Sequence, residues 1–125
     1  MTKLNLNRRE FDNLVERALD QLPEMFARYL AEVPVVVEDT PTQAVCQRVG
    51  LKKGYGLLGV FMGVPLKNRR TFASTGPNQI ILYRKNLLAT GGNHDDLAEQ
   101  IRRTVVHELG HYVGFSEDQL RQAGY

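Results

Sequence analysis

Residues 107–118 carry the most informative pattern in the chain and read His107-Glu-Leu-Gly-His111-Tyr-Val-Gly114-Phe-Ser-Glu117-Asp118. Before and within it, apolar residues recur every three or four positions, as on one face of a helix. These core-facing residues are Ala98, Ile101, Val105, Leu109 and Tyr112. At about 100° per residue, His107 and His111 stand only about 40° apart, on the side away from that stripe. The pattern predicts an amphipathic helix over residues 95–114 that presents two imidazoles together.

Two histidines one turn apart, with a glutamate directly after the first, are typical of a metal site on a helix. Imidazole and carboxylate are usual zinc ligands, and catalytic zinc sites keep three protein ligands and a fourth position for water. We therefore predict that His107 and His111 bind Zn²⁺. Glu108 falls between the histidine side and the core stripe, where its carboxylate can take a proton from a metal-activated water. Glu108 is the predicted catalytic base.

Position in the chain limits which residues can be the third metal ligand. Glu117 stands where the extended H-E-x-x-H-x-x-G-x-x pattern places its third ligand, and Gly114 lets the chain turn back toward the histidines. Asp118 is the neighbouring alternative, and Cys46 and His94 are more remote candidates upstream. An acidic residue here is also favoured simply by the dipole of the helix that follows. The prediction is Glu117, with Asp118 left open.

The two ends of the chain carry helix signals of their own. Asn7 with Glu10 fits a capping box, and we expect one long N-terminal helix from there to about Ala31, kinked at Pro23. Ser116 opens a second capping box, which predicts a short last helix.

Between the helices, three short β-branched or apolar runs are typical of strands. These runs are residues 33–38, 57–63 and 79–84. Residues 40–56 are expected to form a loop or a short helix, and residues 67–77 a polar loop. The whole chain, residues 1–125, is predicted to be a single α+β domain in which a small sheet packs on the N-terminal helix and the metal helix.

Composition excludes several function classes. The chain has 125 residues with a net charge of +2, and its basic residues are scattered in pairs rather than gathered in a patch. We therefore expect no nucleic-acid partner. No stretch approaches the roughly 20 apolar residues that span a bilayer, so no membrane segment is expected. The single cysteine, Cys46, cannot form an internal disulfide, which favours a reducing, cytoplasmic location.

The chain also resembles a known family, the small bacterial proteins called minimal zincins. The resemblance spans nearly the whole chain and includes LLGVFMGVPL at residues 57–66, IILYR at 80–84 and the stretch from 107 to 120. It implies a zincin-like fold, with a small mixed three-stranded sheet and the metal helix beneath it. It also implies a zinc-dependent metallopeptidase that acts on a peptide or protein substrate.

The family's motif, carried over to this chain, implies His107, His111 and Glu117 as the metal ligands and Glu108 as the base. By the same resemblance, an edge strand above the metal pairs with the extended substrate. Either residues 57–63 or residues 80–84 are expected to form that edge.

Sequence leaves three kinds of function open. The first is a general zinc peptidase, for which Tyr112, Tyr83 and Tyr125 are the candidates to stabilise the oxyanion. The second is a non-catalytic module, in which zinc stabilises the fold or a partner-binding cleft. The third is a regulatory protease specific for one partner. The oligomeric state is also left open.

Overall fold

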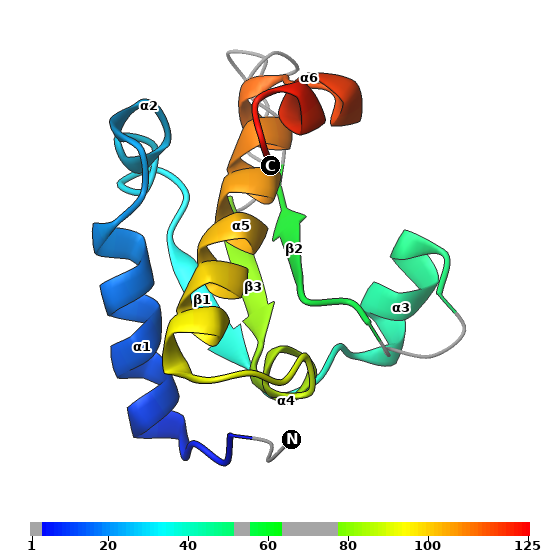
Figure 1. Ribbon diagram of the computed structural model, residues 1–125. Helices are drawn as coiled ribbons and strands as arrows, with labels where there is room; N and C mark the ends of the chain where they lie inside the picture. Colours follow the sequence, from blue (N-terminus) through cyan, green and yellow to red (C-terminus); the bar gives the residue numbers. More distant parts are fainter. Residues whose placement is uncertain (1–3, 52–55, 64–77) are drawn as a thin grey trace.

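A computed structural model describes residues 4–51, 56–63 and 78–125, and its centre is a three-stranded mixed sheet. The strands are β1 (Val35–Glu38), β2 (Gly59–Met62) and β3 (Gln79–Tyr83), in the order β1-β3-β2. β1 runs parallel to β3, whereas β2 runs antiparallel to it, as Figure 1 shows. The expected mixed sheet is confirmed.

Of the two candidate edges, residues 57–63 contain the edge strand β2. The alternative, 80–84, is wrong because β3 is paired on both sides.

The N-terminal segment forms two helices instead of the single kinked helix expected from its periodicity. α1 (Arg8–Asp20) begins at the predicted capping box of Asn7 and Glu10, and α2 (Glu24–Ala27) follows after a break. Pro23 caps α2. The break arises because proline lacks an N–H and disfavours helical backbone in the residue before it. The apolar periodicity nevertheless continues across the break, since both helices bury residues in the same core.

α5 (His94–Val113) is the longest helix and carries the histidine motif. Asn93 caps its start in a capping box, and Gly114, at φ 114°, ends it in the left-handed conformation expected of that glycine. α5 packs against α1 on one side and against the sheet on the other (Figure 1). The predicted core stripe is confirmed, since Ala98, Ile101, Val105, Leu109 and Tyr112 are all buried. The opposite side of α5 is thereby left for the polar residues of the motif.

Three shorter helices complete the described structure. α3 (Gln43–Val49) lies within residues 40–56, where a loop or short helix was expected, and packs Val45 on the sheet face that α5 does not cover. α4 (Arg84–Leu88) follows β3 without a turn, so the third strand ends one residue before the predicted limit. α6 (Glu117–Gln122) is the predicted last helix. The expected loop at 67–77 lies outside the described residues. None of the described helices has the length and apolar character needed to cross a bilayer.

Candidate metal centre

Three side chains of the histidine motif converge at the C-terminal end of α5. His107 and His111 project from successive turns, and their Nε2 atoms lie 3.2 Å apart. Oε1 of Glu117, the first residue of α6, lies 3.1 Å from Nε2 of His107 and 2.9 Å from Nε2 of His111. About a third of each histidine side chain is exposed, at 35%, and Glu117 is 62% exposed. The cluster is therefore open to solvent on one side.

The turn between α5 and α6 places Glu117 in this cluster. Gly114 ends α5 with a left-handed conformation, and the N–H of Phe115 then donates to the carbonyl of Gly110 at 2.8 Å. This pairing satisfies a free carbonyl of the last helical turn and reverses the chain. Ser116 caps α6 in the capping box expected from sequence, so the new helix starts at Glu117. The local sequence thus directs the carboxylate back toward the histidines.

The three converging atoms fit a zinc ion. Ligands bound tetrahedrally at about 2.0 to 2.1 Å stand about 3.3 Å from one another. The three observed separations, 2.9, 3.1 and 3.2 Å, form a nearly equilateral triangle close to that size. Two imidazole nitrogens and a carboxylate oxygen also match the donor chemistry that zinc prefers. This is also the only group of three or more potential ligands found among the described residues.

The cluster also acts on the ionisation of Glu117. Desolvation works to raise the pKa of this carboxyl, but hydrogen bonds and charge attraction from His107 and His111 outweigh it, and the pKa lies below its ordinary value. Glu117 is therefore a carboxylate at neutral pH, which is the form that binds a metal.

Glu108 lies beside the cluster but takes no part in it. Its carboxylate is largely shielded from water, and this desolvation raises the pKa of Glu108 above its ordinary value. The nearby His111 and His107, and a hydrogen bond from the backbone of Phe61, act in the opposite direction. The hydrogen bond is informative about position, because Phe61 belongs to β2. Glu108 thus spans the gap between the metal motif and the edge of the sheet.

The edge of β2 that does not pair with β3 turns backbone N–H and C=O groups toward this gap. The N–H of Tyr83 donates to the carbonyl of Leu58 at 3.0 Å, and antiparallel strands alternate between hydrogen-bonded and non-hydrogen-bonded pairs. Gly59 and Phe61 therefore belong to the non-hydrogen-bonded pairs, and their N–H and C=O groups are directed away from β3. Phe61 uses this direction to reach Glu108.

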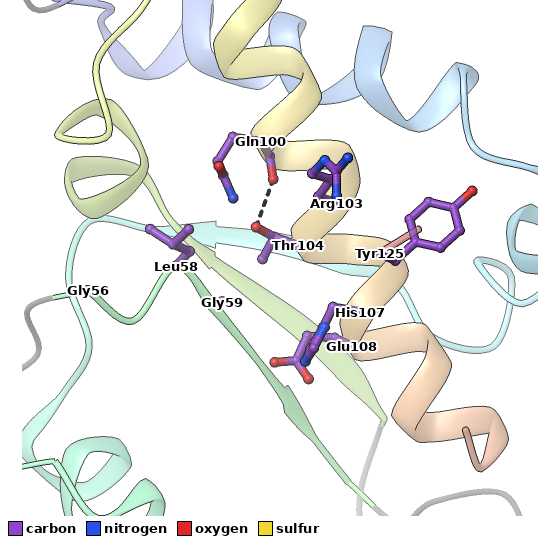
Figure 2. A pocket seen from close by; sticks show the side chains of 9 residues that line it. All are labelled: Gly56, Leu58, Gly59, Gln100, Arg103, Thr104, His107, Glu108 and Tyr125. Carbon is purple, nitrogen blue, oxygen red and sulfur yellow. Dashed lines mark hydrogen bonds between the residues drawn. The ribbon is translucent and has the colours of Figure 1, made fainter. Parts of the chain in front are cut away.

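A pocket of about 330 Å³ continues from the motif along α5. In Figure 2, the side chains of Gln100, Arg103 and Thr104 precede His107 and Glu108 along the helix, and the chain entering β2 lies opposite. Its lining residues are Gly56, Leu58, Gly59, Gln100, Arg103, Thr104, His107, Glu108 and Tyr125. A volume of about 300 Å³ is at the small end of ligand sites, enough for a short piece of a larger molecule.

The other ligand candidates lie elsewhere. Asp118 is exposed and its Oδ1 accepts a hydrogen bond from Nη2 of Arg121 at 3.1 Å. Cys46 is buried in α3. His94 is exposed at the first position of α5, at the end of the helix remote from the cluster.

The three tyrosines proposed as oxyanion partners lie in different places relative to the site. The hydroxyl of Tyr112 donates to Oε1 of Glu32 at 2.9 Å, and its ring is fully buried. Tyr83 is fully buried and packs with Val45 on the sheet face remote from α5. Tyr125 lines the pocket. Only Tyr125, among the three, borders the candidate site.

Sequence reasoning missed the residues that extend the site beyond the motif. Gln100, Arg103 and Thr104 line the pocket, and Gly110 lies where α6 packs onto α5. The signal was present for the first three, because they precede His107 at spacings of three, four and seven residues, on the same side of the helix. Leu58 and Gly59 fall within residues 57–63, one of the two segments expected to form the edge above the metal, but their place opposite these three residues depends on how the sheet packs against α5.

Fold and site together define a zincin, in which a helix carries the H-E-x-x-H motif beneath the edge of a small sheet. A family model described as zincin-like metallopeptidase matches residues 30–125, and the chain belongs to this family. Among solved structures, it is similar to a conserved hypothetical protein from Thermo thermophilus, with 26% identity and a TM-score of 0.53. That similarity covers 86% of this chain and 94% of the other. No curated protein matched the chain.

Proposed function

We propose that this chain is a zinc-dependent peptidase, with His107, His111 and Glu117 as the metal ligands and Glu108 as the general base. The observation that carries the proposal is the triangle of donor atoms, with sides of 2.9 to 3.2 Å, open to solvent and next to a shielded carboxylate. Membership of the zincin-like metallopeptidase family supports the same reaction class.

Zinc held by these ligands would supply a water activated near neutral pH and positive charge beside the substrate carbonyl. Glu108 would serve as the proton carrier, taking a proton from the attacking water at its carboxylate and passing it to the nitrogen of the leaving amine. Its shielded position suits this role, because a raised pKa brings a carboxylate closer to the pH at which it must both take up and release a proton. Gly59, at the edge of β2, offers its N–H and C=O to the backbone of an extended peptide.

A non-catalytic role for zinc has a specific observation in its favour. Glu117 belongs to α6 while both histidines belong to α5, so a bound ion would join the two helices. Structural zinc sites, however, are closed by four protein ligands. Among the described residues only three converge here. Three protein ligands are the number that catalytic zinc sites use, which supports catalysis over a purely structural role.

The experiment compares wild-type protein, purified without a metal-affinity tag, with Glu108→Gln, His111→Ala and the matched surface variant Glu16→Gln. Zinc is counted by mass spectrometry, and cleavage is followed in a library of peptides derived from a proteome, so that a narrowly specific enzyme is also detected. We expect about one zinc per chain in wild type, Glu16→Gln and Glu108→Gln, and none in His111→Ala. Turnover should fall by about 100-fold or more in Glu108→Gln, the usual loss of a general base.

Equal cleavage by wild type and Glu108→Gln would show that the proposed base is wrong. Zinc in wild type without cleavage of any peptide would favour the structural role. Absence of zinc from wild type, even after zinc is added and the excess removed, would overturn both.

A further inference from the structure

The pocket beside the metal motif is lined by the sheet side, by α5 and by Tyr125, and the first two differ in chemistry. On the side of the sheet it is formed by Leu58 and by Gly56 and Gly59, which have no side chains. On the side of α5 it is formed by polar groups, among them Gln100 and Arg103 (Figure 2). Among the described residues that line it, one is an arginine, Arg103, and one is an acid, Glu108. Glu108 stands at the metal end, so Arg103 determines the charge of the other end.

The guanidinium of Arg103 is held in place from two sides. Its Nε donates to Oε1 of Glu99 at 3.1 Å, and its Nη1 donates to the carbonyl of Gly124 at 3.1 Å. In the part of the chain that the structure describes, Nη2 has no hydrogen-bond partner, and about half of the side chain, 48%, is exposed. A cation fixed in position loses less conformational entropy on binding a ligand than a mobile one.

Among the described residues, Glu99 neutralises this cation only in part. Glu99 accepts hydrogen bonds from Arg102 at 2.7 and 2.9 Å as well as from Arg103, so two guanidiniums share one carboxylate. A positive charge therefore remains at this end of the pocket. Gln100 lines the same wall one turn further along, where its side-chain amide can supply a second hydrogen bond.

We infer that this pocket receives a carboxylate of the peptide substrate, which pairs with Arg103 while the scissile bond lies at the metal. The carboxylate is either an aspartate or glutamate side chain or the C-terminus of the peptide. The inference rests on the proposed peptidase function and names the class of substrate.

The spacing along the helix gives the position of the carboxylate in the substrate. Arg103 precedes His107 by four residues, which is a rise of about 6 Å along α5. An extended peptide advances about 3.3 Å per residue. The carboxylate thus lies about two residues from the bond that is cleaved.

The test measures binding without turnover, in full-length zinc-loaded Glu108→Gln. The probes are fluorescent octapeptides of alanine, glycine and leucine, acetylated and amidated, with one glutamate placed at each position in turn. A second set has glutamine at those positions, and a third has glutamine and a free C-terminal acid. Fluorescence anisotropy gives the affinities. The same peptides are then tested for cleavage by wild type.

We expect one or two adjacent glutamate positions to bind about 5- to 20-fold more tightly than their glutamine counterparts, the range of a charge-assisted, partly exposed contact. Arg103→Ala in the same background should abolish this preference, and Arg103→Lys should keep part of it. Arg17→Ala is the matched control, since Arg17 pairs with Asp95 at 2.7 Å and does not line the pocket. It should keep the full preference. Circular dichroism and zinc content establish that each variant is folded and loaded.

A gain confined to the free-acid set would support the inference with the peptide C-terminus as the source. Equal binding of glutamate, glutamine and free-acid peptides would overturn it, as would equal effects of Arg103→Ala and Arg17→Ala. Failure here is distinguishable from failure of the proposed function. Wild type that cleaves peptides without regard to charge is a peptidase lacking this pocket preference. If the glutamate peptides bind more tightly but no peptide is cleaved, the carboxylate pocket is supported and the proposed peptidase function is wrong.

Discussion

Gly110 and Leu120 are in direct contact, and this contact sets the distance between α5 and α6. A Cβ atom at Gly110 would lie 2.5 Å from Cδ2 of Leu120 and 3.0 Å from Cδ1. Leu120 is 1% exposed, so its side chain has little room to move away. Because Glu117 lies one turn before Leu120, the glycine determines how closely the carboxylate approaches the two histidines.

Gly110→Ala should therefore weaken zinc binding by about 10-fold or more, the usual cost of disturbing the residues that position a ligand. The free energy of unfolding without metal should change by less than about 2 kcal/mol, because overpacking is offset by the better helix propensity of alanine. Competition with a chromophoric chelator measures the affinity, and urea unfolding in the presence of EDTA measures the stability.

The double variant Gly110→Ala with Leu120→Ala is the control. Removing the leucine side chain makes room for the added methyl group, so the two changes should be less than additive in their effect on zinc affinity. Strict additivity would mean that the glycine acts on the site by another route.

Glu117 and Asp118 offer a matched pair for testing the third ligand. Glu117→Gln should lower zinc affinity by more than about 100-fold, because it removes a ligand instead of an outer partner. Asp118→Asn makes the same change of charge on the next residue but affects only an exposed contact with Arg121, and should leave the affinity unchanged.

Thermal unfolding gives a second measurement of the same pair. Zinc at about 100 times its dissociation constant adds about 2.7 kcal/mol of stability, or about 10 °C in Tm for a chain of this size. Wild type and Asp118→Asn should gain this increase and Glu117→Gln should not. The opposite result would assign the third ligand to Asp118.

The parts of the fold that sequence predicted correctly are those fixed by neighbouring residues. The capping boxes at Asn7 and Ser116 and the left-handed Gly114 depend on hydrogen bonds and backbone angles within a few positions. The core stripe of α5 could be predicted equally well from sequence, because helical spacing is a local property. The convergence of Glu117 with the histidines follows from these same local features.

What sequence did not predict depends on packing between distant segments. β3 is central because it pairs with both β1 and β2, which no pattern within residues 79–84 determines. α4 starts at Arg84, whose guanidinium donates to Asp39 at 2.9 Å and to the carbonyl of Leu6 at 2.8 Å. Those partners are remote in sequence. The pocket as a whole depends on such packing too, since helical spacing marks only its α5 side and it forms where the entry to β2 lies opposite α5.

Tyr112 is expected to serve the fold and not the reaction. Its hydroxyl donates to Glu32, and its ring contacts those of Tyr29 and Phe61 at centroid distances of 6.1 and 5.3 Å. Tyr112→Phe should cost about 1 kcal/mol of unfolding free energy through the lost hydrogen bond. Peptide turnover and zinc affinity should match wild type. A loss of about 100-fold in kcat, as for removal of an oxyanion donor, would place this hydroxyl in the chemistry.

Tyr83 should make the protein sensitive to alkaline pH. It is fully buried, and its hydroxyl has no hydrogen-bond partner among the described residues. Burial, together with the charges of Glu38 and Cys46, raises the pKa of Tyr83 from 10.0 to about 12. The folded protein therefore holds this proton more tightly than the unfolded chain does. The resulting stability is fully present below pH 10 and is lost as the pH rises toward 12, by up to about 2 to 3 kcal/mol.

Tyr83→Phe removes both the titrating group and the unpaired hydroxyl. At pH 7 the variant should be as stable as wild type or more stable by up to about 1 kcal/mol, because a buried hydroxyl without a partner is unfavourable. Between pH 10 and 11 its advantage should grow, since only wild type must keep a proton on Tyr83 to remain folded. Urea unfolding at pH 7 and pH 10.5 measures this difference, with Tyr29→Phe as the control for tyrosine content. A constant difference at the two pH values would mean that Tyr83 reaches water or a partner in the folded protein.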